Sequence, residues 1–269
     1  MTHYERLVAL NTRDLLSAFK LSGSNGLWNR LARFPAQRFA KELLAFDETV
    51  ERQGFIEGGR QFLKSFAGSV TVIGAGNIPC SGPLLIASNH PGMTDAMALW
   101  VAINREDLMI IGADRDLLRL LPNTCAHLIL IEKNSSTAFR KAESHLKSGG
   151  SLLTFPAGRI EPDVTVHQGA CESLASWSHS VAALKRRVPE TALLPAFVRG
   201  VISAKAVNNP FLRYLKDQKE RDWAGATLQI VCPAYRKVDA KVDFGTPTDS
   251  FEGVIAQMRE FIHRSDSGV

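Results

Sequence analysis

The sequence is poor in cysteine, and the four cysteines among its 269 residues lie far apart. No Cys-x-x-Cys pair and no finger-spaced histidine occurs, so neither a zinc site nor a disulfide framework is predicted. There is also no run of 18 or more apolar residues, which argues against a membrane-spanning helix, and the first ten residues lack the apolar block of a secretory signal. We therefore expect a protein of the reducing cytoplasm.

The composition that remains is that of a globular protein, with 45% hydrophobic and 22% charged residues. Lys and Arg number 32 against 27 for Asp and Glu, and this net charge of +5 favours an anionic partner. Nucleic acid, anionic lipid, coenzyme A and an acidic carrier protein all fit that charge, and so does a mildly basic protein without such a partner. Because no nucleic-acid-binding motif accompanies the charge, we do not expect a nucleic-acid partner.

The periodicity of apolar residues divides the chain into residues 1–67, an amphipathic helical segment, and residues 68–269, an α/β domain. In the first part we expect two or three helices, with breaks at Gly23 to Gly26 and at Pro35. The stretch Leu27 to Leu44 mixes aromatic residues with Arg and Lys. Two interpretations fit this mixture: a helix lying on an anionic membrane surface, or a helix packed on the core with a solvated basic face.

After Gly68, short β-rich runs alternate with helical segments, which predicts a mainly parallel twisted sheet flanked by helices. The clearest helices are expected at Thr94 to Asn104, Ser136 to Lys147, Ala170 to Arg187 and Phe251 to Arg264. The strands are expected at Val70 to Ile73, Leu84 to Ser88, Leu108 to Gly112, His127 to Glu132, Ser151 to Phe155, Ala192 to Val198, Leu228 to Cys232 and Val238 to Phe244.

The most informative segment is Asn89-His90-Pro91-Gly92-Met93-Thr94-Asp95, which stands between an apolar strand and an apolar helix. On one continuous helix, residues five apart would point about 140° away from each other. With His90 on a turn and Asp95 in the first turn of the helix, the carboxylate can instead fold back onto the imidazole. A histidine held by a carboxylate is suited to general-base catalysis, although each residue alone is also ordinary at a turn or at a helix start.

Two further polar segments follow predicted strands. Phe155-Pro156-Ala157-Gly158-Arg159 supplies a glycine whose N–H can serve an oxyanion and an arginine that can bind a phosphate or carboxylate, while Lys133 follows Leu130-Ile131-Glu132. Each segment alone is also typical of an ordinary loop between secondary-structure elements. Because ligands of open α/β sheets bind outside the carboxyl ends of the strands, we expect the three segments to converge on one rim.

These segments resemble the defining blocks of the glycerolipid acyltransferase superfamily, which acts on glycerol-3-phosphate, 1-acylglycerol-3-phosphate and lysophospholipids. The His90 segment resembles its His-x4-Asp block, and the Phe155 segment resembles its Phe-Pro-Glu-Gly block. Leu130-Ile131-Glu132-Lys133 and Leu193-Leu194-Pro195-Ala196 resemble two weaker blocks, and the likeness covers about Val70 to Pro247. Ala157 stands where many members have Glu, Arg159 comes one place early, and Lys133 replaces Arg; whether Glu161 replaces the missing acid stays open.

The resemblance implies an enzyme that moves a fatty acyl group from an acyl thioester to a hydroxyl of a lysophospholipid or related lyso-lipid. His90 and Asp95 would be the catalytic pair, and Lys133, Phe155, Pro156, Gly158 and Arg159 would bind substrate. Acyl-CoA or acyl carrier protein would be the co-substrate, with no cofactor and no metal, and the protein would sit in the cytoplasm, peripherally on the inner face of the membrane. A catalytically inert lipid or acyl-carrier binding protein of the same fold is the alternative.

Overall fold

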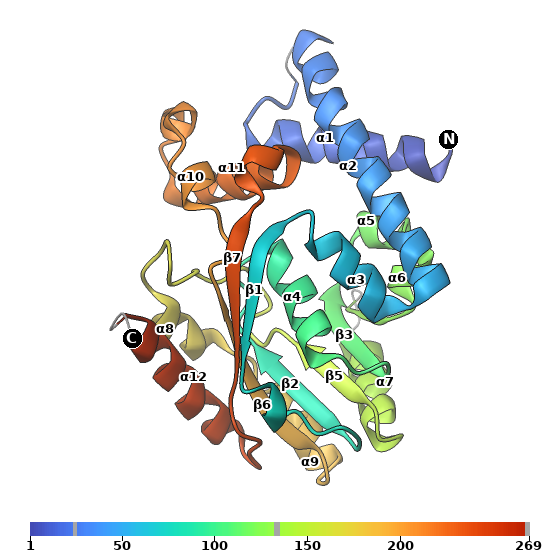
Figure 1. Ribbon diagram of the computed structural model, residues 1–269, viewed down its shortest axis with the longest axis vertical. Coiled ribbons are helices and arrows are strands. Elements are labelled where there is room, and N and C mark those ends of the chain that lie inside the picture. Colours follow the sequence, from blue (N-terminus) through green and yellow to red (C-terminus); the bar gives the residue numbers. More distant parts are fainter. Residues whose placement is uncertain (24–25, 132–134, 267–269) are drawn as a thin grey trace. The chain divides into compact units, whose positions relative to one another are not determined.

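The computed structural model describes residues 1–23, 26–131 and 135–266 of the chain (Figure 1). The chain divides into two compact units. Unit 1 comprises Met1–Gly68, Arg115–Cys125 and Ile202–Val238, and unit 2 comprises Ser69–Asp114, Ala126–Val201 and Asp239–Val269. The predicted division into residues 1–67 and 68–269 stays a prediction about domains.

Unit 2 is built on a seven-stranded sheet in the order β1-β7-β6-β2-β5-β3-β4. Pairing is parallel from β6 through β2, β5 and β3 to β4, while β7 is antiparallel to β6. The mainly parallel sheet predicted from the alternation of strands and helices is thus confirmed. The strands are β1 (Ala67–Ile73), β2 (Leu84–Ser88), β3 (Leu108–Ala113), β4 (Leu128–Ile131), β5 (Ser151–Thr154), β6 (Ala192–Arg199) and β7 (Val238–Phe244).

The order of the strands creates a switch point between the neighbours β2 and β5. From β2 the chain crosses through α4 (Met93–Ile103) to β3, on the far side of β5; from β5 it crosses to β6, on the far side of β2. The two connections leave in opposite directions, and right-handed crossovers therefore lie on opposite faces of the sheet. A crevice at the carboxyl ends of two such strands is the usual ligand site of an open α/β sheet.

One face of this sheet carries a large apolar core. Side chains of α7 (Ser135–Lys147), α8 (Ala170–Ser173), α9 (Ser180–Arg187) and α12 (Phe251–Asp266) pack there. They meet alternate residues of the central strands, such as Leu85, Leu152 and Leu193, all fully buried. The intervening residues of β2 are equally buried, so this strand is enclosed on both faces, as its continuous apolar sequence requires.

Unit 1 is helical. Asp47 is buried within α2, where its carboxylate accepts hydrogen bonds from the amide and hydroxyl of Thr124, both at 2.7 Å. Arg236 pairs with Glu42 at 2.8 Å and lies over the ring of Phe66. These contacts join the three chain segments of the unit. Its helices are α1 (His3–Ala18), α2 (Gly26–Gln53), α3 (Phe55–Leu63), α5 (Asp116–Arg119), α6 (Pro122–Cys125), α10 (Ala204–Val207), η3 (Pro210–Tyr214), α11 (Gln218–Val231) and η4 (Pro233–Tyr235).

Three expectations about local structure were wrong. The predicted break at Pro35 does not occur, because α2 runs through it. A proline costs the helix one N–H bond, and the buried residues Ala32, Ala36 and Phe39 still form one packed face around it. The predicted strand Leu228 to Cys232 lies at the end of α11. The prediction failed because a short apolar run has the same pattern in a strand and in a buried helix.

The third error concerns the predicted helix Ala170 to Arg187. It is instead α8, a single 3-10 turn η2 (Leu174–Ser176) and α9, interrupted at Trp177, whose ψ of 129° is extended. After Trp177, the amide of Ser178 donates to the carbonyl of Pro156 at 2.9 Å. The interruption therefore ties this segment to the loop that follows β5.

Candidate active site

The imidazole of His90 and the carboxylate of Asp95 are hydrogen bonded. The distance from Nδ1 to Oδ2 is 2.8 Å, and the Asp95 side chain is fully buried while that of His90 is 26% exposed. Because a carboxylate only accepts, Nδ1 carries the proton and Nε2 presents its lone pair. This is the tautomer that a general base needs.

The local sequence explains why Asp95 turns back toward His90. Asp95 is the third residue of α4, and its Oδ2 also accepts from the amide of Gly92, the N-cap residue, at 3.0 Å. Its Oδ1 accepts from the amide of Ala96. A carboxylate in the first turn thus satisfies helix amides that lack partners within the helix, and the same group orients the histidine.

Asn89, just before His90, extends the sheet beyond β2. Its side chain donates to the carbonyl of Val198 and accepts from the Val198 amide, both at 2.8 Å. On the opposite side, the ring of His90 stacks on Phe155, with centroids 4.3 Å apart and planes inclined by 28°. His90 follows β2 and Phe155 follows β5, so the two predicted segments meet at the switch point of the sheet.

The environment raises the pKa of His90. Burial acts to lower the pKa, since it disfavours the charged ring, but the negative charge of Asp95, its hydrogen bond and the charge of Glu161 outweigh that effect. The protonated form of the His90 ring is therefore stabilised by its surroundings.

The Phe155 segment forms a tight turn. The amide of Gly158 donates to the carbonyl of Phe155 at 3.0 Å, and Gly158 has a φ of +62°, which favours glycine. Pro156 is buried, whereas Gly158 and Arg159 are exposed, and the guanidinium of Arg159 lies 3.2 Å from the hydroxyl of Ser176. Since the Gly158 N–H is engaged inside the turn, the glycine shapes the turn, and we assign it no oxyanion contact.

Glu161 is the residue for which the sequence left open whether it replaces the acid missing at Ala157. Its side chain is only 4% exposed. Oε2 accepts from the amide of His90 at 3.0 Å, while Oε1 accepts from the hydroxyl of Ser173 at 2.7 Å and from the indole of Trp177 at 2.8 Å. The signal that was missed is the break before α9, which brings the indole of Trp177 to this carboxylate.

The other predicted positions fare differently. Lys133 lies outside the described residues. Arg199, at the end of β6, is mostly buried and pairs with Asp243 at 2.8 Å and with the Ser265 hydroxyl at 2.9 Å. Its donors therefore join β6 to β7 and to α12. Among residues 1–23, 26–131 and 135–266, no group of three or more His, Cys, Asp or Glu side chains could hold a metal ion.

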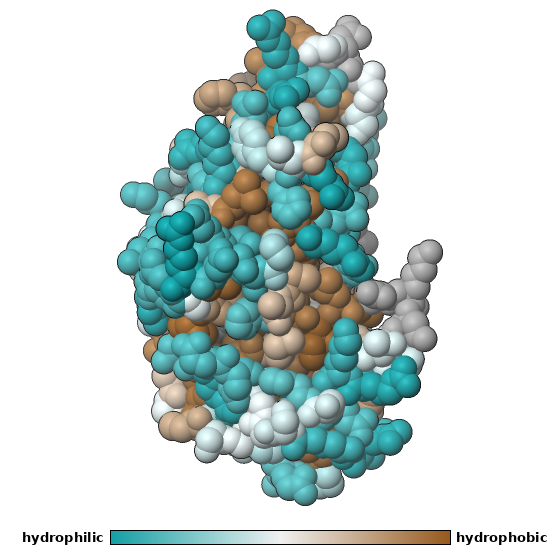
Figure 2. Space-filling view, turned by 90° about the vertical axis from the view of Figure 1, so that its right-hand side faces the viewer, coloured by the Kyte–Doolittle hydropathy of each residue, from teal (hydrophilic) through white to brown (hydrophobic). Residues whose placement is uncertain are grey.

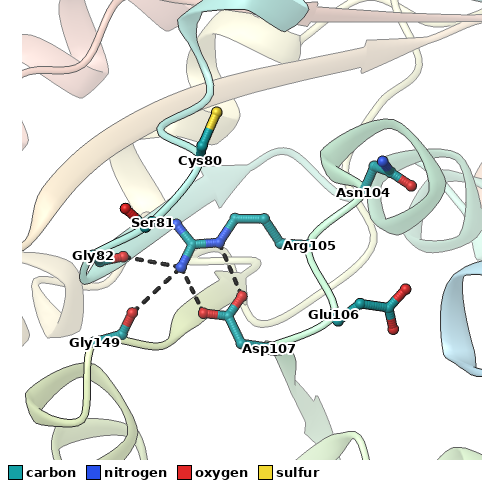
Figure 3. A pocket seen from close by; sticks show the side chains of 8 residues that line it. All are labelled: Cys80, Ser81, Gly82, Asn104, Arg105, Glu106, Asp107 and Gly149. Atoms are coloured by element: carbon teal, nitrogen blue, oxygen red, sulfur yellow. Dashed lines mark hydrogen bonds and ion pairs between the residues drawn. The ribbon is translucent and has the colours of Figure 1, made fainter.

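A hollow of about 350 Å³ lies at the other end of the strands (Figure 3). The guanidinium of Arg105 spans it, reaching the carbonyls of Gly82 at 3.0 Å and Gly149 at 3.3 Å and the carboxylate of Asp107. Gly82, Asp107 and Gly149 stand just before β2, β3 and β5, so Arg105 joins the loops that enter the central strands. Its hydrogen bonds are made within the protein, which identifies it as a structural clip.

Taken together, a histidine held by a carboxylate lies at the switch point of a parallel sheet, stacked on Phe155 of the neighbouring turn, and such a pair is suited to general-base chemistry. Residues 69–189, which include the whole of that constellation, match the acyltransferase family model. The resemblance to an acyltransferase that was drawn from the sequence is thus confirmed over this segment.

Neither the solved structures nor the curated proteins add to what the site's geometry says about its chemistry. A solved structure that aligns with the chain is the 1-acyl-sn-glycerophosphate (LPA) acyltransferase PlsC from Thermotoga maritima. It is 15% identical, the alignment covers 99% of this chain and 94% of that one, and the TM-score is 0.49. No curated protein matches the chain.

Proposed function

We propose that the protein transfers a fatty acyl group from an acyl thioester, acyl-CoA or acyl carrier protein, to a hydroxyl of a lysophospholipid or related lyso-lipid. The observation that carries this proposal is the 2.8 Å contact between His90 Nδ1 and Asp95 Oδ2. It lies at the carboxyl end of β2, inside the segment that matches the acyltransferase family.

In the proposed reaction, Nε2 of His90 takes the proton of the acceptor hydroxyl as its oxygen attacks the thioester carbonyl. The tetrahedral intermediate collapses, the carbon–sulfur bond breaks, and the departing thiolate takes the proton back from His90. Asp95 holds the ring and balances its charge throughout. No covalent acyl-enzyme is formed, and the products are the acylated lipid and the free thiol.

The cationic side of the site is assigned to Arg159. Arg159 is exposed beside the Phe155 turn, and within the described part of the chain its guanidinium has a single hydrogen bond, to the neutral hydroxyl of Ser176. That arrangement leaves donors for a phosphate or carboxylate of a substrate. Lys133 is proposed for the same role from its place in the sequence.

The N-terminal part of α2 supports a peripheral association with an anionic membrane. Residues 26–41 carry four cations and no Asp or Glu. Leu27, Leu31 and Phe34, spaced to share one face, are 64%, 56% and 76% exposed, and Trp28 beside them is 46% exposed. Apolar side chains break the polar surface in several places in Figure 2. Exposed apolar groups flanked by cations suit the interface of anionic lipids.

No helix within the described part of the chain is long and apolar enough to cross a bilayer.

The function is tested by incubating purified protein with acyl-CoA or acyl carrier protein donors and a panel of lyso-lipids. Acyl transfer is followed by thiol release and by mass spectrometry of the lipid products. Acceptor-dependent thiol release that disappears in His90→Ala, with folding intact, is the expected result. Binding of lipid or acyl carrier without turnover by any donor and acceptor would replace the proposal with an inert binding protein of the same fold.

A further inference from the structure

Glu161 and His90 are joined through their main chains as well as through the Glu161 side chain. The amide of Glu161 donates to the carbonyl of His90 at 2.8 Å, and the amide of His90 donates to Oε2 of Glu161 at 3.0 Å. The two residues are 71 positions apart in the sequence. This reciprocal pair fixes the turn after β2 to the loop after β5.

The Glu161 carboxylate is itself held from behind. The hydroxyl of Ser173 and the indole N–H of Trp177 both reach Oε1, at 2.7 and 2.8 Å. With His90 on Oε2, both oxygens are engaged by the protein, and the side chain is 4% exposed. Glu161 therefore does not face the acceptor, and it does not replace the acid that the family carries at the position of Ala157.

We propose that Glu161 is a positioning residue for the base: its buried carboxylate, braced by Ser173 and Trp177, locks the main chain of His90 so that Nε2 faces the substrate. This inference rests on the proposed function. A displacement of about 1 Å at a reacting atom costs on the order of 100-fold in rate. The hydrogen bond of Asp95 holds one edge of the ring, and Phe155 covers one ring face. Neither of them anchors the backbone from which the ring projects.

Electrostatics provides a readout that separates positioning from simple stability. Asp95 on α4 and Glu161 on the loop after β5 are the two charges that raise the pKa of His90, against the lowering effect of burial. Removing the charge of Glu161 should therefore lower that pKa. A base with a lower pKa stays unprotonated to lower pH, so the acidic limb of the pH–rate profile should move toward lower pH.

The decisive variant is Glu161→Gln. Three donors converge on the two oxygens of Glu161, whereas Gln has one oxygen and one NH₂ group. In one orientation this NH₂ faces the amide N–H of His90, and in the other it faces the indole N–H of Trp177. We expect kcat to fall roughly 10- to 100-fold with little change in KM. We also expect the acidic limb, and the titration of His90 followed by NMR of the free protein, to move to lower pH.

The matched control is Asp163→Asn. Asp163 is 1% exposed in the same loop, and its carboxylate accepts from the amides of Gly200 and Val201 at 3.0 and 2.8 Å. This variant should lose stability in the same way as Glu161→Gln while keeping the kcat of the folded protein and the acidic limb of wild type. Equal behaviour of the two variants, or wild-type kcat in Glu161→Gln, would overturn the proposal.

If Glu161→Gln does not fold, the same measurements are made on Glu161→Asp. It keeps the charge but is one methylene shorter and loses its reach to the His90 amide. A reduced kcat with a nearly unmoved acidic limb supports the proposal, and a wild-type kcat overturns it. If wild type transfers no acyl group at all, the proposed function fails, while the NMR titration of His90 still decides whether Glu161 acts on it.

Discussion

Replacing Asp95 by Asn keeps the shape of the side chain but removes its charge and one of its two acceptor oxygens. In the native site, Oδ2 accepts from both His90 Nδ1 and the Gly92 amide, at 2.8 and 3.0 Å, and Oδ1 accepts from the Ala96 amide. An Asn side chain cannot satisfy all three donors. If its oxygen takes the place of Oδ2, its NH₂ opposes the Ala96 amide; if its NH₂ faces His90, the ring must carry its proton on Nε2.

The second orientation abolishes the base, because a protonated Nε2 cannot take the acceptor proton. The first orientation keeps the tautomer but loses the charge that stabilises the imidazolium. We therefore expect kcat to fall by about 10²- to 10⁴-fold, the usual contribution of a general base. At 1.36 kcal/mol for each factor of ten, this corresponds to about 2.7–5.4 kcal/mol of transition-state stabilisation.

The assay is the initial rate of thiol release at saturating donor and acceptor over a range of pH. Thermal unfolding of the same preparation shows whether the variant is folded. A folded Asp95→Asn protein that keeps its kcat within about threefold of wild type across that range would refute the assignment of His90 and Asp95. A large loss of kcat in a folded protein supports it.

Three further predictions concern the base, the far end of the sheet and α2. In the proposed reaction His90 must be neutral to act, and Asp95 and Glu161 raise its pKa from the ordinary 6.5 of histidine. The value of kcat/KM should therefore fall as the pH drops through a value above 6.5. An acidic limb at or below pH 6.5 contradicts this prediction. Arg105→Ala should lower the free energy of unfolding by about 1–3 kcal/mol, since it leaves the partly buried carbonyls of Gly82 and Gly149 without this donor, and should leave the kcat of the folded protein unchanged; denaturant titration measures this, and a loss below about 1 kcal/mol would count against Arg105 as a structural clip. Replacing Leu31 and Phe34 by Ser should reduce co-sedimentation with phosphatidylglycerol vesicles severalfold, whereas Ile73→Ser, at an apolar site on β1 about as exposed as Leu31, should not; equal retention of wild type and both variants would argue against α2 as the lipid contact.

The contact between His90 and Asp95 could be predicted from the sequence because its determinants are local. Only four residues lie between His90 and Asp95, and a Pro-Gly turn followed by a helix start leaves the carboxylate few positions to occupy. The continuous apolar run of β2 likewise predicts a strand that is buried on both faces. These features follow from steric limits and from the amides that a helix leaves without partners in its first turn.

What joins distant segments was decided only by the tertiary structure. The order of the strands brings the ends of β2 and β5 together, and no sequence period encodes which strands become neighbours. The tertiary structure also decides the hydrogen bond between the Glu161 carboxylate and the His90 amide. Trp177, which holds that carboxylate from behind, lies at a break before α9 that the apolar pattern does not reveal. A carboxylate becomes a brace only when burial removes water and donors from several segments converge on it, and both conditions are properties of the packed chain.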